Sequence, residues 1–226
     1  MMPTIPRLAL ITGASRGLGA ALAHELTERG VRVLAPSRTE LDLSSDHSID
    51  AYINKHGSTP VDILVNNAGI NTLRSITEID SQTWNTMLQI NLSSALRLTQ
   101  AFAPGMSARG WGRILNLSTI FSVVNKERRA AYSMTKAGLN ALTRSSAIEF
   151  GPSGVLVNAL APGFVDTALT RQNNSPDAIA AITGSLPLRR LAQPIEIARL
   201  AAFLVSEENT YLTGQTIVAD GGFTCQ

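Results

Sequence analysis

Short apolar runs alternate with longer amphipathic segments along this chain, and the two patterns predict strands and helices respectively. The apolar runs predict buried strands at Leu8–Ile11, Val31–Ala35, Ile63–Val65, Arg113–Leu117, Val155–Val157 and Thr216–Val218. Apolar residues at helical spacing predict helices over about Gly17–Arg29, Trp84–Met106 and Ala130–Phe150. Strands that alternate with helices form βαβ units, so we expect an α/β fold: one doubly wound parallel sheet flanked by helices.

This alternation continues from end to end without a linker-like stretch, so residues 1–226 are expected to form one domain. The long helix at 84–106 shows the clearest apolar stripe, formed by Leu88, Leu92, Ala95, Leu96, Thr99 and Phe102. The least regular stretch is 163–187. It contains Asn173, Asn174, Pro176 and Gly184, and it is expected to form a mobile flap.

Composition places the chain among ordinary globular proteins. Hydrophobic residues make up 44% of the sequence, charged residues make up 16%, and the formal net charge is +2. Basic residues do not cluster beyond the pairs 128–129 and 189–190, so no nucleic-acid partner is expected. Arginine is far more common than lysine, which occurs only at positions 55, 126 and 136.

Cysteine and histidine offer no support for a disulfide or a metal site. Cys225 is the single cysteine, and His24, His47 and His56 lack ligand spacing, so we expect no metal. No apolar stretch approaches the roughly 18 residues that cross a bilayer. The first seven residues lack signal-peptide features, and a cytoplasmic location without membrane contact is therefore expected.

A glycine-rich turn, Thr12–Gly19, joins the first predicted strand to the first predicted helix. Its glycines at 13, 17 and 19 allow tight turning and close approach of a ligand to the backbone. The helix start supplies free N–H groups and a positive dipole end, which suit a pyrophosphate. The spacing differs from the G-x-G-x-x-G pattern, so a purely packing role remains open.

A second candidate feature is Tyr132 followed by Lys136 at the start of a predicted helix. Residues four apart share a helix face, so the phenol and the ammonium are expected to be neighbours. A nearby cation lowers the pKa of a phenol and makes it a usable proton donor or acceptor. An isolated pair with this spacing is also typical of a solvent-exposed surface.

The glycine turn and the Tyr132–Lys136 pair together resemble the short-chain dehydrogenase/reductase family. Further matches keep the family's order from about Leu8 to Gly222: Asn66–Gly69, Asn91, Pro162–Gly163 with Thr167, and Asp220–Gly222. The resemblance implies a Rossmann-type sheet and an NAD(P)-dependent enzyme acting on a small-molecule carbonyl or alcohol substrate.

The resemblance also implies catalytic roles. Tyr132 would protonate the carbonyl oxygen, Lys136 would hold the ribose hydroxyls and depress the pKa of Tyr132, and Asn91 would anchor a proton relay. The family places a serine 13 residues before the tyrosine. Thr119 stands there in this chain, so we prefer Thr119 to Ser118 as the hydroxyl that polarises the substrate.

The resemblance gives a long set of expected cofactor contacts: Gly13, Ser15, Arg16, Gly17, Leu18, Gly19, Ser37, Arg38, Asp42, Leu43, Asn67, Ala68, Gly69, Tyr132, Lys136, Pro162, Gly163, Val165 and Thr167. The chain is too short after the second strand for a full helix and strand before Asp42, so this unit is expected to be shortened. Ser37, Arg38 and Arg16 favour NADP(H) over NAD(H) because a basic site suits a 2′-phosphate. Glu40 lies close enough to weaken that preference.

The substrate is less defined. Leu186–Arg190, Pro194–Ala198 and Thr213–Gln215 resemble 3-oxoacyl-(acyl-carrier-protein) reductases, where Arg109 would lie near a carrier-protein docking site. Keto-sugars and other small carbonyls remain alternatives, as does a non-catalytic cofactor-binding sensor. The polar segment 125–129 would meet an acidic or hydrophilic substrate, or form a solvated loop. The two long predicted helices resemble the family's dimer interface, which implies a homodimer or homotetramer.

Overall fold

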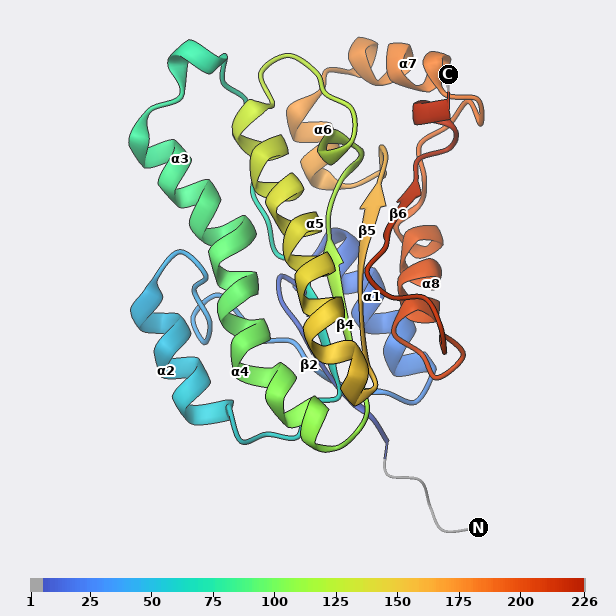
Figure 1. Ribbon diagram of the computed structural model, residues 1–226. Coiled ribbons are helices and arrows are strands. Elements are labelled where there is room, and N and C mark those ends of the chain that lie inside the picture. Colours follow the sequence, from blue (N-terminus) through green and yellow to red (C-terminus); the bar gives the residue numbers. More distant parts are fainter. Residues whose placement is uncertain (1–5, 226) are drawn as a thin grey trace.

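Six apolar segments pair in parallel to form one sheet in the computed structural model, which describes residues 6–225 (Figure 1). The strands are β1 (Leu8–Ile11), β2 (Arg32–Leu34), β3 (Ile63–Asn66), β4 (Gly112–Leu117), β5 (Val155–Pro162) and β6 (Thr216–Ala219). Their order across the sheet is β2-β1-β3-β4-β5-β6. The predicted α/β class is confirmed.

Helices cover both faces of this sheet. They are α1 (Gly17–Glu28), α2 (Asp46–His56), α3 (Ser81–Leu88), α4 (Ser94–Ala108), α5 (Ala130–Phe150), α6 (Ala168–Asn173), α7 (Pro176–Ser185) and α8 (Pro194–Leu204). Short 3₁₀ turns lie at Ile76–Glu78, Ile120–Ser122, Gly151–Ser153 and Phe223–Cys225. Figure 1 shows α4 and α5 side by side over one face of the sheet.

Alternate residues of each strand feed two separate cores. In β1, Leu8 and Leu10 pack with α2 and α4, whereas Ala9 and Ile11 pack with α1 and α8. Successive side chains of a strand point to opposite faces. Because both faces are buried, the strand reads as an unbroken apolar run rather than an alternating one.

The order of the strands places a ligand crevice between β1 and β3. The chain winds outward from β1 to β2, then crosses back to β3 and continues the other way. The loops after β1 and β3 therefore separate at the carboxyl edge of the sheet, where ligands bind in doubly wound folds.

The predicted shortening after the second strand is confirmed, because β2 forms the edge of the sheet and the chain forms no further strand between β2 and β3. Helix α2, which the hydrophobic pattern did not reveal, occupies the space. Only Ile49 and Tyr52 of this helix are buried, so its apolar stripe is too sparse to recognise. Ser45 caps its first turn by accepting the Ser48 N–H.

The long helix predicted over 84–106 exists, but a π-helical turn at Gln89–Ser93 separates α3 from α4. Each extra residue in a turn rotates the next part of the helix by about 100°. Residues placed on one face by constant helical spacing therefore do not all share that face beyond the π-helical turn. Ala95 and Phe102 are buried as predicted, whereas Leu96 is exposed.

The stretch 163–187, which was expected to be irregular, is instead largely helical, and its expected mobility stays a prediction. Thr167 and Ser175 cap α6 and α7 by accepting N–H groups three residues on, and Pro176 occupies the first position of α7. These capping signals were present in the sequence. Within residues 6–225, no helix is long and apolar enough to cross a membrane.

Candidate active site

The glycine turn after β1 has a backbone conformation and close contacts that leave no room for a side chain at two of its glycines. Gly13 has a φ of +66°, and a Cβ atom there would lie 2.9 Å from the Ala68 Cα. A Cβ at Gly19 would lie 2.3 Å from the Gly13 carbonyl oxygen. The turn is thus folded tightly against the segment that follows β3.

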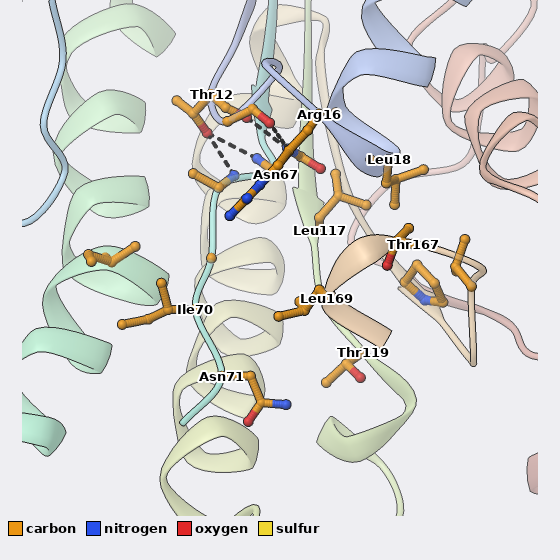
Figure 2. Close-up of a pocket in the computed structure, with 18 of the residues that line it drawn as sticks. Thr12, Arg16, Leu18, Asn67, Ile70, Asn71, Leu117, Thr119, Thr167 and Leu169 are labelled. Carbon is orange, nitrogen blue, oxygen red and sulfur yellow. Dashed lines mark hydrogen bonds between the residues drawn. The ribbon is translucent and has the colours of Figure 1, made fainter. Parts of the chain in front are cut away.

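Two polar side chains hold these segments together (Figure 2). The Thr12 hydroxyl accepts the backbone N–H groups of Asn67 and Ala68, each at 3.1 Å. The Asn67 amide donates to the Thr12 and Gly13 carbonyl oxygens at 2.8 and 3.1 Å. These four bonds fix the wall of a cavity of about 470 Å³ at the carboxyl edge of the sheet.

The start of α1 offers this cavity an anion-binding end. Arg16 precedes the helix, no side chain caps its first N–H groups, and its first turn contains no acidic residue. The free N–H groups and the helix dipole suit the diphosphate of a dinucleotide. Across the cavity, the Thr167 methyl group lies 3.7 Å from where a Gly17 Cβ would stand. The glycine turn and the loop after β5 thus approach each other and both line the cavity.

Beside the glycine turn, the turn after the neighbouring strand β2 carries both basic and acidic groups. The Arg38 side chain is 81% exposed and lies 3.5 Å from the Asp42 carboxylate. The Ser37 backbone N–H and hydroxyl both donate to Glu40 at 2.8 Å, and these bonds lower the pKa of Glu40. Ser37, Arg38 and Asp42 line the cavity.

Tyr132 lies at the start of α5, half-buried and facing the cavity. Burial raises the pKa of its phenol, and a hydrogen bond from Thr119 and the charge of Arg129 oppose that rise. The Lys136 Nζ lies 5.9 Å from the ring centroid. The resemblance implied that Lys136 would depress the pKa of Tyr132, and this stays a prediction.

Lys136 is 3% exposed, and its ammonium donates to the Leu117 carbonyl oxygen at 2.5 Å. Burial lowers the pKa of Lys136 from its usual 10.5 to about 8. Asn91 lies beside it: a Cβ on Gly69 would stand 3.3 Å from the Asn91 Oδ1 and 3.4 Å from the Lys136 Nζ.

Asn91 itself occupies the π-helical turn, a feature that often accompanies functional sites. It is 2% exposed and does not line the cavity directly. Its Oδ1 accepts the Ile70 N–H at 2.8 Å, and its amide donates to the Ile70 carbonyl oxygen and the Thr135 hydroxyl. Asn91 therefore ties the loop after β3 to α5.

Ser118 and Thr119 follow β4, and their side chains have different partners. The Ser118 hydroxyl donates to the Ser122 hydroxyl at 3.1 Å and to the Lys136 carbonyl oxygen at 3.4 Å. The Thr119 hydroxyl interacts with Tyr132 instead. Of these two hydroxyls, Thr119 is therefore the one that contacts Tyr132.

Every residue expected to contact the cofactor lines this one cavity, together with Ser118 and Thr119. Sequence reasoning did not place Asn71 in the site, although it lines the cavity. Arg129 also lines the cavity, and it ends the segment 125–129 that was expected either to meet the substrate or to form a solvated loop. Among the described residues, no group of three His, Cys, Asp or Glu side chains could hold a metal ion.

Comparisons with known proteins agree with this geometry. Residues 34–224 match the family model described as enoyl-(acyl carrier protein) reductase. A 3-oxoacyl-[acyl-carrier-protein] reductase of Pseudomonas aeruginosa is 36% identical over 96% of both chains. A gluconate 5-dehydrogenase from Burkholderia cenocepacia J2315, in complex with NADP and tartrate, superposes with a TM-score of 0.92 at 30% identity, covering 97% of this chain and 96% of the other. A short chain dehydrogenase/reductase family protein superposes with a TM-score of 0.88 at 33% identity, over 96% and 97% of the two chains.

Proposed function

We propose a separate catalytic role for each of several residues in this site. The chain belongs to the short-chain dehydrogenase/reductase family and is an oxidoreductase that interconverts a ketone and a secondary alcohol. The observation that carries the proposal is the meeting of Thr119, Tyr132 and Lys136 with the glycine turn in one cavity. When bound there, a nicotinamide cofactor would supply or accept the hydride.

Tyr132 is the acid and base of the proposed reaction. Because burial raises the pKa of its phenol, Tyr132 is protonated at neutral pH and can donate to the oxygen of a ketone. Thr119 holds that oxygen through its hydroxyl, while Lys136 holds the cofactor's ribose. Asn91 keeps the loop after β3 in place beside Lys136 and anchors the path by which a proton returns.

Removal of single hydroxyls tests these roles. Tyr132→Phe is expected to bind NADPH normally and to lose turnover. Thr119→Val is expected to lower kcat about 100-fold or more, and Ser118→Ala less than 10-fold, because only Thr119 meets the reacting oxygen. Loss of turnover in Ser118→Ala with normal turnover in Thr119→Val would overturn the assignment.

The cofactor proposed is NADP(H) in preference to NAD(H). Arg16 and Arg38 line the cavity and are the cations available to a 2′-phosphate. NADP is also the cofactor in the Burkholderia gluconate 5-dehydrogenase structure. The negative charge of Glu40 would oppose this preference for a 2′-phosphate. However, the Glu40 carboxylate accepts a hydrogen bond from Ser37, and Glu40 does not line the cavity.

Fluorescence titration with both cofactors measures the preference. Wild type is expected to bind NADPH at least 10-fold more tightly than NADH. Arg38→Ala is expected to weaken NADPH binding alone, and Glu40→Gln is expected to strengthen it. Equal affinity of the wild type for NADH and NADPH would refute the proposal.

Two substrate classes are proposed from the relatives: 3-oxoacyl thioesters and keto-sugars or their acids. Arg109, the residue expected near a carrier protein, donates to the Val61 carbonyl oxygen at 2.5 Å and pairs with Asp62 at 3.4 Å. This engagement leaves Arg109 less available for docking and favours small ketones over carrier-bound ones. NADPH oxidation over 3-oxoacyl thioesters, keto-sugars and cyclic ketones tests the choice, and no turnover anywhere would favour a cofactor-binding sensor.

The proposed assembly is a homodimer or homotetramer formed through α4 and α5. Leu96 on α4 is 41% exposed and Ile148 on α5 is 78% exposed, so both helices present apolar side chains to the surface. Light scattering should give at least twice the mass of the chain, and a monomer would overturn the proposal. A cytoplasmic location stays a prediction.

A further inference from the structure

Arg129 is a buried cation beside the reacting tyrosine. It is only 6% exposed, although it lines the active-site cavity at the start of α5. Its guanidinium carbon lies 4.4 Å from the centroid of the Phe121 ring. The charge acts on Tyr132, whose pKa it lowers. The segment 125–129, one reading of which was a solvated loop, therefore places its last residue inside the site.

No anion balances this charge within residues 6–225. The ion pairs of the other arginines involve aspartate or glutamate, but no carboxylate of the described chain pairs with Arg129, and its guanidinium donates no hydrogen bond to the described residues. Its contact with Phe121 offsets only part of the cost of burial. A buried unpaired charge is expensive, and buried arginines normally have an anionic partner. Arginine also stays protonated in proteins, so loss of a proton does not relieve the cost.

The backbone before Arg129 is held in an uncommon conformation. Arg128 has a φ of +64°, in the left-handed region that non-glycine residues seldom adopt. Its carbonyl oxygen accepts the Arg74 N–H at 3.1 Å, which fixes this bend against the loop after β3. Backbone strain of this kind clusters at ligand sites. Here the strained residue, Arg128, immediately precedes the buried Arg129.

The surroundings of Arg129 suit a small polar ligand. Asn71 and Thr119 lie at the same end of the cavity, away from Arg16 and the glycine turn (Figure 2). The Asn71 Oδ1 is buried and has no hydrogen-bond partner among the described residues. Phe121 and Phe164 meet edge to face at 6.0 Å and close one wall. This end of the cavity therefore combines an unpaired cation, an unpaired acceptor and an aromatic wall.

We propose that Arg129 binds a carboxylate of the substrate, so that the enzyme acts on small ketones that carry a carboxylate near the carbonyl group. A guanidinium donates two parallel hydrogen bonds to a carboxylate, and this pairing fixes the orientation of the ketone against Tyr132. One cation suits a monoanion better than a phosphate dianion. The other cations that line the cavity are Arg16 and Arg38 at the cofactor end and Lys136, whose ammonium already binds Leu117. The unpaired Asn71 acceptor suits a substrate hydroxyl.

This inference rests on the proposed reaction, so one experiment follows turnover and a second follows binding alone. In the first, kcat/KM is measured with NADPH for keto acids of four to six carbons and for their neutral methyl esters. Wild type is expected to prefer each acid to its ester about 100-fold, the scale of a charged hydrogen-bonding pair. Arg129→Met, which keeps the length of the side chain, should lose this preference, because its kcat/KM for each acid should fall far more than its kcat/KM for the ester.

Arg129→Lys should keep part of the preference, and Lys126→Met serves as the matched control because it removes an exposed cation from the same loop. Equal losses for acid and ester in Arg129→Met, or no preference in wild type, would overturn the inference. The esters also distinguish the proposed reaction from the proposed carboxylate site. If wild type reduces the esters and shows no preference for the acids, the proposed reaction is supported and only the carboxylate site is refuted.

The second experiment needs no turnover. Gluconate and its uncharged counterpart sorbitol are titrated calorimetrically into the enzyme loaded with NADP. Gluconate is expected to bind wild type at least 10-fold more tightly than it binds Arg129→Met, and sorbitol is expected not to distinguish the two. Equal gluconate affinity for both proteins would contradict a carboxylate site at Arg129 even if the enzyme turned over no ketone.

Discussion

Lys136 should make the protein less stable at neutral pH than it would be without this charge, and Lys136→Met tests this. The side chain is 3% exposed, and burial lowers its pKa from 10.5 to about 8. At about 1.4 kcal/mol for each pH unit, that gap corresponds to a cost on the order of 3 kcal/mol for holding the charge in the folded protein. The hydrogen bond to the Leu117 carbonyl oxygen returns about 1 kcal/mol, so the variant should be more stable at pH 7 by about 2 kcal/mol.

The pH dependence gives the sharper result. Between pH 8 and 10.5 the unfolded chain retains a proton on Lys136 that the folded protein has released. Stability rises with pH wherever the unfolded state binds more protons, so the wild type gains stability across this window and the variant does not gain this contribution. The advantage of Lys136→Met should therefore be present at pH 7, shrink above pH 8 and disappear or reverse by about pH 10.

Urea denaturation of the cofactor-free protein at pH 7, 8, 9 and 10 measures the effect. Lys126→Met is the matched control, since Lys126 is exposed and its loss should change stability little at any of these values. Lys136→Met should also lose turnover despite its greater stability. A stability difference between wild type and Lys136→Met that stays constant from pH 7 to pH 10 would refute the claim that burial depresses this pKa.

Three further predictions concern the frame around the site. Gly19→Ala should weaken NADPH binding at least 10-fold and lower the thermal midpoint by several degrees, since a Cβ would stand 2.3 Å from a carbonyl oxygen; titration and calorimetry check this. Asn91→Leu should cost about 1–3 kcal/mol in urea denaturation, because it leaves the N–H and carbonyl of Ile70 unpaired, and an unchanged midpoint would contradict that role. Arg190→Ala should raise the pKa of Glu196 from about 2 toward its usual 4.5, as followed by NMR, because the arginine hydrogen bond is the largest cause of the lowering. Glu196 with its pKa held near 2 in Arg190→Ala would show that another group is responsible.

The sequence determined the parts of this protein that depend on neighbours along the chain. Runs such as Leu8–Ile11 are apolar because both faces of the sheet are covered, so the strands and their parallel direction followed from the pattern alone. The predicted cofactor contacts all line one cavity, because they sit on loops that leave the same edge of a parallel sheet. The missing strand after β2 was also visible, as a shortage of residues.

Local signals were weaker where burial is sparse or the helix is irregular. Helix α2 buries only two side chains, so the sequence shows no apolar stripe that would predict this helix. The π-helical turn at 89–93 changes which residues of α4 face the core. The capping residues Thr167 and Ser175 mark the starts of α6 and α7, but the prediction rested on the Asn, Pro and Gly residues of this stretch and did not use them.

Only the tertiary structure decided which polar groups meet and which charges are buried. Ser118 and Thr119 are adjacent hydroxyls in the sequence, and the packing of α5 against β4 directs one toward Lys136 and the other toward Tyr132. The same packing encloses Arg129 at the end of a segment that reads as polar and solvated. Spacing along a helix fixes which residues share its face, but the cost of burying a charge depends on what other segments place around it, and that is set only when the chain has folded.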